Sequence, residues 1–176
     1  MTYAAFLQGR LLAAGSLADV ALAVRDAPGA LVFEEASGKQ IDLDTRGTDD
    51  EIRARHAEAA RGPGRPRLGV TAREVTLLPR HWGWLGAQPG GASVALRKLV
   101  ELASRDPKGA RQEARDAAYR FASAMAGNEA GFEEAMRALY AGKRKRFRRQ
   151  IESWPPDVRT HLEKMAGQAF EKDDED

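Results

Sequence analysis

The sequence predicts an α+β protein, with a small mixed or antiparallel sheet and one helix at the N-terminus, a central strand-helix-helix unit and an all-helical C-terminal part. Three observations lead to this prediction. Short apolar segments with strand-like spacing fill residues 1–44. A basic, Gly- and Pro-rich stretch at 61–71 is unsuited to a helix or a central strand, and is therefore the predicted linker. From residue 110 to residue 170, apolar residues recur at helical spacing.

The first elements are a hairpin and a helix. Apolar segments at 2–8 and 11–14 flank Gly9 and Arg10, and a glycine between two such segments is a hairpin signal. Ser16 is expected to cap the helix that follows, because its hydroxyl can accept a hydrogen bond from the first helical turn.

Two more strands and a second helix complete the predicted N-terminal domain, residues 1–60. The strands are expected at 30–35 and 39–44, and the second of these alternates apolar and polar residues. Thr48 then begins a short helix, because threonine is a good N-cap and the three acidic residues after it favour the positive end of the helix dipole. Few apolar residues follow Ile52, so we expect this helix to be exposed.

The central unit, residues 72–106, combines three short elements. A strand over 72–78 is expected to end at Pro79, a short helix follows over 80–87, and Ser93 is expected to cap a second helix. A unit of this size has too little apolar surface to fold alone. Either it packs on the preceding sheet, or two copies pair their strands.

The C-terminal part, residues 110–170, is predicted to be helical, and the charged tail 171–176 is expected to be disordered. The apolar stripes that define its helices are Ala114, Ala118, Phe121 and Met125; Phe132, Met136, Leu139 and Tyr140; Phe147, Ile151 and Trp154; and Val158, Leu162, Met165 and Ala169.

The formal net charge of +2 is the result of cancellation between unequal segments. Residues 1–60 carry 6 Lys and Arg against 10 Asp and Glu, residues 61–111 carry 10 against 3, and residues 112–176 carry 12 against 13. The basic middle segment suits a polyanionic partner such as nucleic acid. Arginine outnumbers lysine by 21 to 7, a bias that suits phosphate binding but also follows from a GC-rich genome.

Several function classes lack support in the sequence. There is no cysteine, which removes disulfides, thiolate metal sites and a cysteine nucleophile. His56, His81 and His161 are too scattered to predict a metal site, and the phosphate-loop, nucleophile-elbow and zinc-protease motifs are absent. We therefore expect no catalytic residues, no metal, no cofactor and no enzyme activity. We also expect a cytoplasmic protein without membrane association, because the sequence has no long apolar run and does not begin like a secretory signal.

The central unit resembles the ribbon-helix-helix family of DNA-binding proteins. Leu77-Leu78-Pro79 is similar to that family's entry into its first helix, and residues 93–100, SVALRKLV, are similar to the opening of its second. The resemblance implies a dimer whose paired strands enter the DNA major groove and whose second helix holds a phosphate at its N-terminus. The predicted strand departs from the family pattern, because neither of its faces is wholly polar and Glu74 repels phosphates.

Two further resemblances concern the whole chain. A small α/β domain followed by such a unit resembles the HicB-type antitoxins, and residues 64–69, GRPRLG, are similar to the linker found there. A second resemblance extends over nearly the whole chain, to the bacterial family called domain of unknown function 2239. It is carried by residues 64–70, 80–85 and 88–93, together with 118–121 and 132–135. That resemblance implies a bacterial protein and no known activity.

The sequence therefore predicts a homodimeric, transcription-regulator-like protein that contacts double-stranded DNA through residues 61–111. In this prediction, linker arginines contact phosphates or a minor groove, and the strand contacts bases. The predicted DNA-binding residues are Arg65, Arg67, Arg73, Thr76, Arg80, Ser93, Arg97 and Lys98. The alternative is a non-enzymatic protein-interaction module, antitoxin-like or a scaffold, whose central unit only dimerises. The plainest alternative is a helix pair packed on its own sheet.

A second basic cluster, residues 143–149, has six positive charges in seven residues. Phe147 keeps helical spacing with Ile151 and Trp154, so we expect the cations to lie on the exposed face of a helix. Two interpretations are open. The cluster is either a surface that binds a polyanion backbone or a solvated face offset by the acidic tail.

Overall fold

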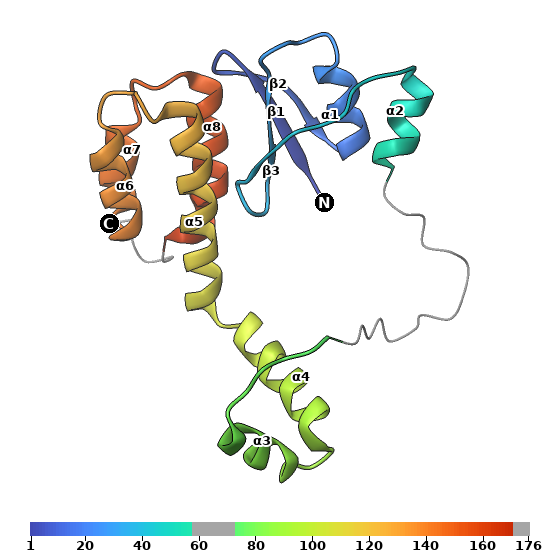
Figure 1. Ribbon diagram of the computed structural model, residues 1–176. Helices are drawn as coiled ribbons and strands as arrows, with labels where there is room; N and C mark the ends of the chain where they lie inside the picture. The colour runs from blue at the N-terminus through green and yellow to red at the C-terminus, as the bar shows by residue number, and fades with distance from the viewer. Residues whose placement is uncertain (58–72, 171–176) are drawn as a thin grey trace. The chain divides into compact units, whose positions relative to one another are not determined.

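The structure is a computed structural model that describes residues 1–57 and 73–170 (Figure 1). The predicted linker 61–71 and the acidic tail 171–176 lie outside the described residues. The chain forms two compact units. Unit 1 contains the N-terminal sheet and the C-terminal helices, and unit 2 contains a central helix pair.

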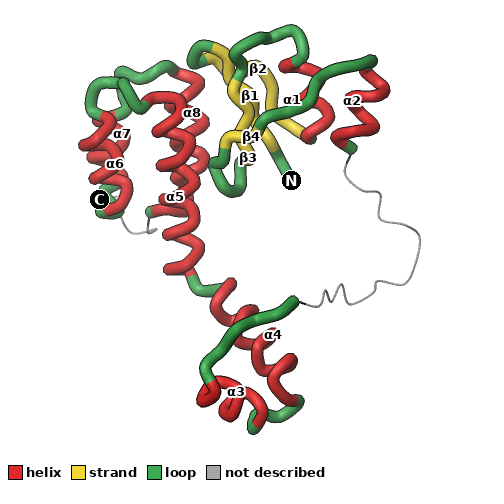
Figure 2. The backbone as a smooth tube through the Cα atoms, in the orientation of Figure 1, coloured by secondary structure: helices red, strands yellow, loops and turns green. Residues whose placement is uncertain are grey.

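Unit 1 contains an α+β fold built on a four-stranded antiparallel sheet (Figure 2). The strand order is β2-β1-β3-β4, so β1 and β3 are the central strands. The four strands predicted within residues 1–44 are confirmed, although the last is shorter than the expected 39–44. The strands are β1 (Tyr3–Leu7), β2 (Arg10–Gly15), β3 (Leu31–Glu34) and β4 (Gln40–Ile41).

The predicted hairpin joins β1 to β2, with its turn one residue earlier than expected. Leu7 pairs with Arg10, so Gln8 and Gly9 are the two turn residues. Both have positive φ, 50° and 79°. Two-residue hairpin turns of this kind require positive φ at both positions, which glycine adopts without strain.

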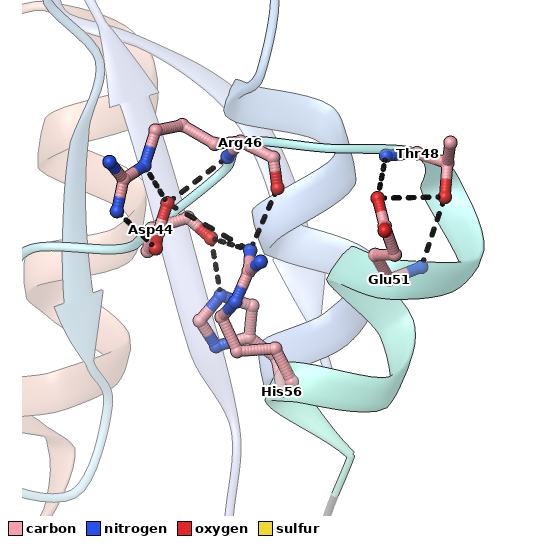
Figure 3. A network of polar contacts seen from close by, with 6 residues as sticks. Asp44, Arg46, Thr48, Glu51 and His56 are labelled. Atoms are coloured by element: carbon pink, nitrogen blue, oxygen red, sulfur yellow. Dashed lines mark hydrogen bonds and ion pairs between the residues drawn. The ribbon is translucent and has the colours of Figure 1, made fainter.

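Two short helices accompany the sheet, α1 (Leu17–Val24) and α2 (Asp49–His56). Ser16 caps α1 as predicted, with its hydroxyl accepting a hydrogen bond from the Asp19 N–H. Thr48 caps α2 through a capping box with Glu51 (Figure 3). As expected, most of α2 is exposed. Ile52 is its buried residue, where α2 packs against α1.

The C-terminal helices follow the predicted apolar stripes. Phe121, Phe147, Ile151 and Trp154 are all buried. The first helix starts earlier than expected, because the Asp106 side chain accepts a hydrogen bond from the Lys108 N–H and the helix begins beside it. The elements are α5 (Pro107–Ala126), α6 (Phe132–Tyr140), α7 (Arg144–Gln150), α8 (Pro156–Met165) and a 3-10 turn, η1 (Ala166–Ala169).

The sheet is buried on both faces. Ala5 lies in a small cluster with Val20 of α1, whereas its neighbours in the strand, Ala4 and Phe6, belong to the core of the C-terminal helices. Phe6 and Phe121 of α5 have ring centroids 5.2 Å apart. Alternate residues of a strand point to opposite faces, so the uninterrupted apolar run in β1 reflects burial on both sides.

The sequence treats residues 1–60 and 110–170 as separate domains, whereas the structure places their described residues in one compact unit with one shared core. The physical reason is that both faces of the sheet carry apolar side chains. Helix α1 packs on one face, so the C-terminal helices have to bury the other. Unit 2 contains α3 (Pro79–Gly86) and α4 (Gly91–Ser104).

Candidate functional site

The segment before α3 does not form the predicted strand. Residues 73–78 are irregular, and among the described residues nothing pairs with the backbone of 73–77. The strand predicted over 72–78 is therefore wrong for the single chain, since a strand needs a neighbouring strand to satisfy its N–H and C=O groups. The segment does not join the sheet of unit 1. Pro79 then starts α3 at a position where its missing N–H has no cost.

Unit 2 leaves most of its large apolar side chains exposed. In its described residues, only Leu85 of α3 and Ala95 of α4 are buried hydrophobic residues. Trp82 and Trp84 are 44% and 54% exposed. Of twelve exposed large hydrophobic residues in the described chain, seven lie in unit 2: Val75, Leu78, Trp82, Trp84, Leu99, Val100 and Leu102. So many exposed apolar side chains in one small unit make it a candidate interaction surface.

At 100° per residue, Leu99, Val100 and Leu102 of α4 fall within one broad face, and Arg97 and Lys98 fall outside it. Ala95 lies on the same face and is buried, whereas Leu102 is 75% exposed. The described residues therefore cover the first part of this face and leave its C-terminal part uncovered. Sequence periodicity identified these residues as apolar helix positions but gave no signal of their exposure.

The structure leaves the predicted DNA-binding side chains accessible. Arg73, Thr76, Arg80, Arg97 and Lys98 are exposed, and they come from the irregular segment, α3 and α4. Among the described residues, no carboxylate pairs with any of the four cations in this group. The two linker residues of the prediction, Arg65 and Arg67, lie outside the described residues.

Ser93 does not cap α4, which corrects the sequence prediction. The helix begins three residues earlier, at Gly91, and its N-cap is Gly90 with φ of 85°. Gly91 also has positive φ, 73°, so the Gly-Gly pair forms a turn that other residues rarely adopt. Ser93 is therefore an exposed residue in the first helical turn, and its carbonyl accepts a hydrogen bond from the Arg97 side chain at 3.2 Å.

Unit 1 contains a polar network around Asp44 (Figure 3). Arg46 donates two side-chain hydrogen bonds of 2.9 Å to the Asp44 carboxylate, which hold the pKa of that carboxyl well below its usual range. Arg55 Nη1 donates to the carbonyls of Asp44 and Arg46, and His56 Nε2 lies 2.9 Å from the Asp44 carbonyl. These contacts fasten α2 to the preceding loop. The lowered pKa makes the carboxylate a weak base, so it does not suit general-base catalysis.

A second polar group lies beside a cleft of about 340 Å³ in unit 1, whose lining includes Thr2, Glu113 and Gln168. Glu35 accepts a 2.9 Å hydrogen bond from Lys164 Nζ, and His161 Nδ1 lies 4.0 Å from the same carboxylate oxygen.

Burial and these neighbours shift the pKa of Glu35, which lines the cleft, and of His161 beside it. Burial raises the pKa of Glu35, but hydrogen bonds from Lys164 and Thr2 outweigh it, so the net pKa is lowered. Burial lowers the pKa of His161. The pair is therefore a carboxylate beside a neutral imidazole. The lining supplies the Thr2 hydroxyl and the Lys164 amine, and the amine is held by its hydrogen bond to Glu35.

The described residues contain no group of three or more His, Asp or Glu placed to hold a metal ion. Within the same residues, no helix has the length and hydropathy needed to cross a membrane.

The fold and this surface define an α+β protein that has a tightly packed sheet-and-helix unit and a second unit with an uncovered apolar helix pair. The chain belongs to the bacterial family described as an uncharacterized protein conserved in bacteria, domain of unknown function 2239 (DUF2239), whose model matches residues 2–166. Comparison with curated proteins and with solved structures gave no match.

Proposed function

We propose that unit 2 is a self-association module through which two copies of this chain dimerise, and that the dimer binds double-stranded DNA through the cations of the module. The observation that supports dimerisation most directly is the exposure of seven large apolar side chains over about 30 residues, 75–102. A helix pair with two buried hydrophobic residues lacks the core needed for stability by itself.

A second copy is the partner that fits this surface best. An isologous dimer places the same apolar face of each copy against the other and needs no additional protein. Residues 73–78 have unpaired backbone groups, and two such segments can pair with each other as an antiparallel ribbon. The resemblance of residues 72–104 to ribbon-helix-helix proteins supports this arrangement.

Charge supports DNA as the ligand of the dimer. Arg73, Arg80, Arg97 and Lys98 are exposed and have no carboxylate partner among the described residues, so pairing two copies doubles an accessible positive surface. Contacts of Lys and Arg with phosphates supply most sequence-independent DNA affinity. Thr76, also exposed, is the uncharged residue best suited to a base contact.

Light scattering coupled to size exclusion tests dimerisation. We expect the wild-type chain of 19.2 kDa to elute at about twice this mass, and the double variant Trp84→Glu, Leu102→Glu to elute as a monomer. Both residues are exposed in the single chain, so the change leaves its core intact. Leu12→Glu in unit 1 is the control, because Leu12 is also an exposed large apolar residue, at 41%, and this variant should remain dimeric. A monomeric wild-type chain contradicts the proposal.

Fluorescence anisotropy with a labelled 20-bp duplex tests DNA binding. We expect binding at 50 mM salt that weakens steeply by 200 mM. The salt slope is the fall in the logarithm of the binding constant per tenfold rise in salt concentration. Replacing Arg73, Arg80, Arg97 and Lys98 by glutamine should lower this slope by about 0.9 for each phosphate that the variant no longer neutralises. A dimer that binds no duplex at 50 mM salt overturns the DNA part of the proposal. That result would favour a protein-interaction module, which the exposed Trp82 and Trp84 suit as interface anchors.

A further inference from the structure

Helix α7 and its N-cap residue Lys143 together carry six cations in unit 1. Phe147 is 1% exposed and packs against Phe170, with ring centroids 5.6 Å apart, and this anchors one side of the helix in the core. The predicted orientation is therefore confirmed. Lys145, Arg146, Arg148 and Arg149 are exposed on the remaining sides.

Nearby carboxylates neutralise only part of this charge. Arg146 forms a 2.7 Å ion pair with Glu134 of α6, which Arg137 also contacts, and Arg148 lies 3.7 Å from Glu163 of α8. Among the described residues, three cations of the cluster have no carboxylate partner: Lys143, Lys145 and Arg149.

This arrangement disfavours the isolated helix. Positive charge in the first helical turn opposes the helix dipole, and α7 has no acidic residue there and no side-chain cap. Lys145 and Arg149 stand four residues apart, a spacing at which like charges repel. Arg146 and Arg148 form ion pairs within unit 1, whereas Lys143, Lys145 and Arg149 gain none from the described residues. A ligand that supplies negative charge offsets these three cations.

We propose that α7 binds the sugar-phosphate backbone of nucleic acid, at a site separate from unit 2 and independent of the function proposed for that unit. A helix that binds a membrane surface exposes apolar side chains beside its cations. None of the exposed large hydrophobic residues of the described chain lies on α7, whose phenylalanine is buried. A purely electrostatic surface of arginine and lysine therefore favours a phosphate backbone over a lipid surface.

The spacing of the unpaired cations fits this ligand. With a rise of 1.5 Å per residue, Lys145 and Arg149 lie about 6 Å apart along the helix axis. Successive phosphates of one strand rise by about 3.4 Å along a duplex axis, so side chains with this separation can contact different phosphates of one strand. The binding is backbone-directed and carries no base preference.

The test compares two charge-neutralised variants of the full chain. Lys145→Gln, Arg149→Gln removes the two unpaired cations of α7, and Arg10→Gln, Lys39→Gln removes two exposed cations of the sheet that have no ion-pair partner among the described residues. Anisotropy titrations with a labelled 20-bp duplex at 50 to 200 mM salt give the salt slope for each. Circular dichroism verifies that both variants are folded.

We expect the α7 variant to have a slope shallower by about 1.8 than the wild type, and the sheet variant to keep the wild-type slope. Equal slopes for the α7 variant and the wild type overturn the proposal, whatever the unit 2 variants show. A wild-type chain that binds vesicles of phosphatidylcholine and phosphatidylserine (7:3) but no duplex also overturns it. A shallower slope in the unit 2 variant alone supports that site and refutes this one.

Discussion

Replacing Gly38 by alanine tests how closely the turn between β3 and β4 is fitted to α5. Gly38 is buried, has φ of +65°, and donates its N–H to the Glu34 carbonyl. A Cβ atom built on it lies 2.0 Å from the carbonyl oxygen of Ala117 and 2.9 Å from the Ala117 Cα. Both atoms belong to the backbone of α5, which cannot move aside as a flexible side chain would.

Two effects set the magnitude. Placing alanine in the left-handed region costs about 1 kcal/mol. Forcing the turn and the helix apart adds the cost of overpacking, about 1–3 kcal/mol. We therefore expect Gly38→Ala to lower the free energy of unfolding by about 2–4 kcal/mol, a large part of the stability of a typical domain.

Gly29→Ala is the matched control. Gly29 also has positive φ, +84°, but a Cβ there meets nothing within 4 Å. This variant should therefore lose only the free energy needed to place alanine in the left-handed region, about 1 kcal/mol. Urea unfolding followed by circular dichroism at 222 nm measures both. If the two variants lose the same free energy, within about 0.5 kcal/mol, the close approach of the turn to α5 is refuted.

Three further predictions concern unit 1. Thr48→Ala removes the capping box of α2 and should lower the free energy of unfolding in urea by about 1 kcal/mol, whereas Thr48→Ser should not. Because burial lowers the pKa of His161 below its ordinary value of 6.5, the folded state binds this proton less readily than the unfolded state. The Tm should therefore fall between pH 7.5 and 5.5, and His161→Gln should make that fall smaller; equal falls would contradict the assignment. Burial and the hydrogen bond to Asp116 raise the pKa of Tyr140 to about 12. Ultraviolet titration should show one of the three tyrosines ionising late, and Asp116→Asn should bring it lower.

Most elements of the fold could be predicted from local signals. Ser16 and Thr48 cap helices where the sequence places them, because capping depends on residues within one turn. The apolar stripes of the C-terminal helices are buried, because 3.6-residue spacing identifies a helix face directly. Family membership was likewise visible in short motifs spread over the chain.

The sequence predictions that were wrong concern elements whose start or pairing depends on backbone geometry or on a segment distant in the chain. α4 starts at Gly90 and Gly91, ahead of Ser93, because both glycines adopt positive φ and form a turn there. The preference of serine for the N-cap position does not predict such a turn. The apolar-rich segment 73–78 was predicted as a strand from its composition, yet a strand forms only where another strand supplies its hydrogen bonds.

The sequence by itself determined the α+β class, the order of the helices, the basic middle segment and which apolar residues share a face. Only the tertiary structure decided what covers each face. Phe6 and Phe121 are far apart in the chain, and their contact joins the sheet to the C-terminal helices in one core. Leu99 and Leu102 have equally regular spacing and remain exposed. Periodicity records which side chains point the same way, whereas burial depends on whether another segment reaches them.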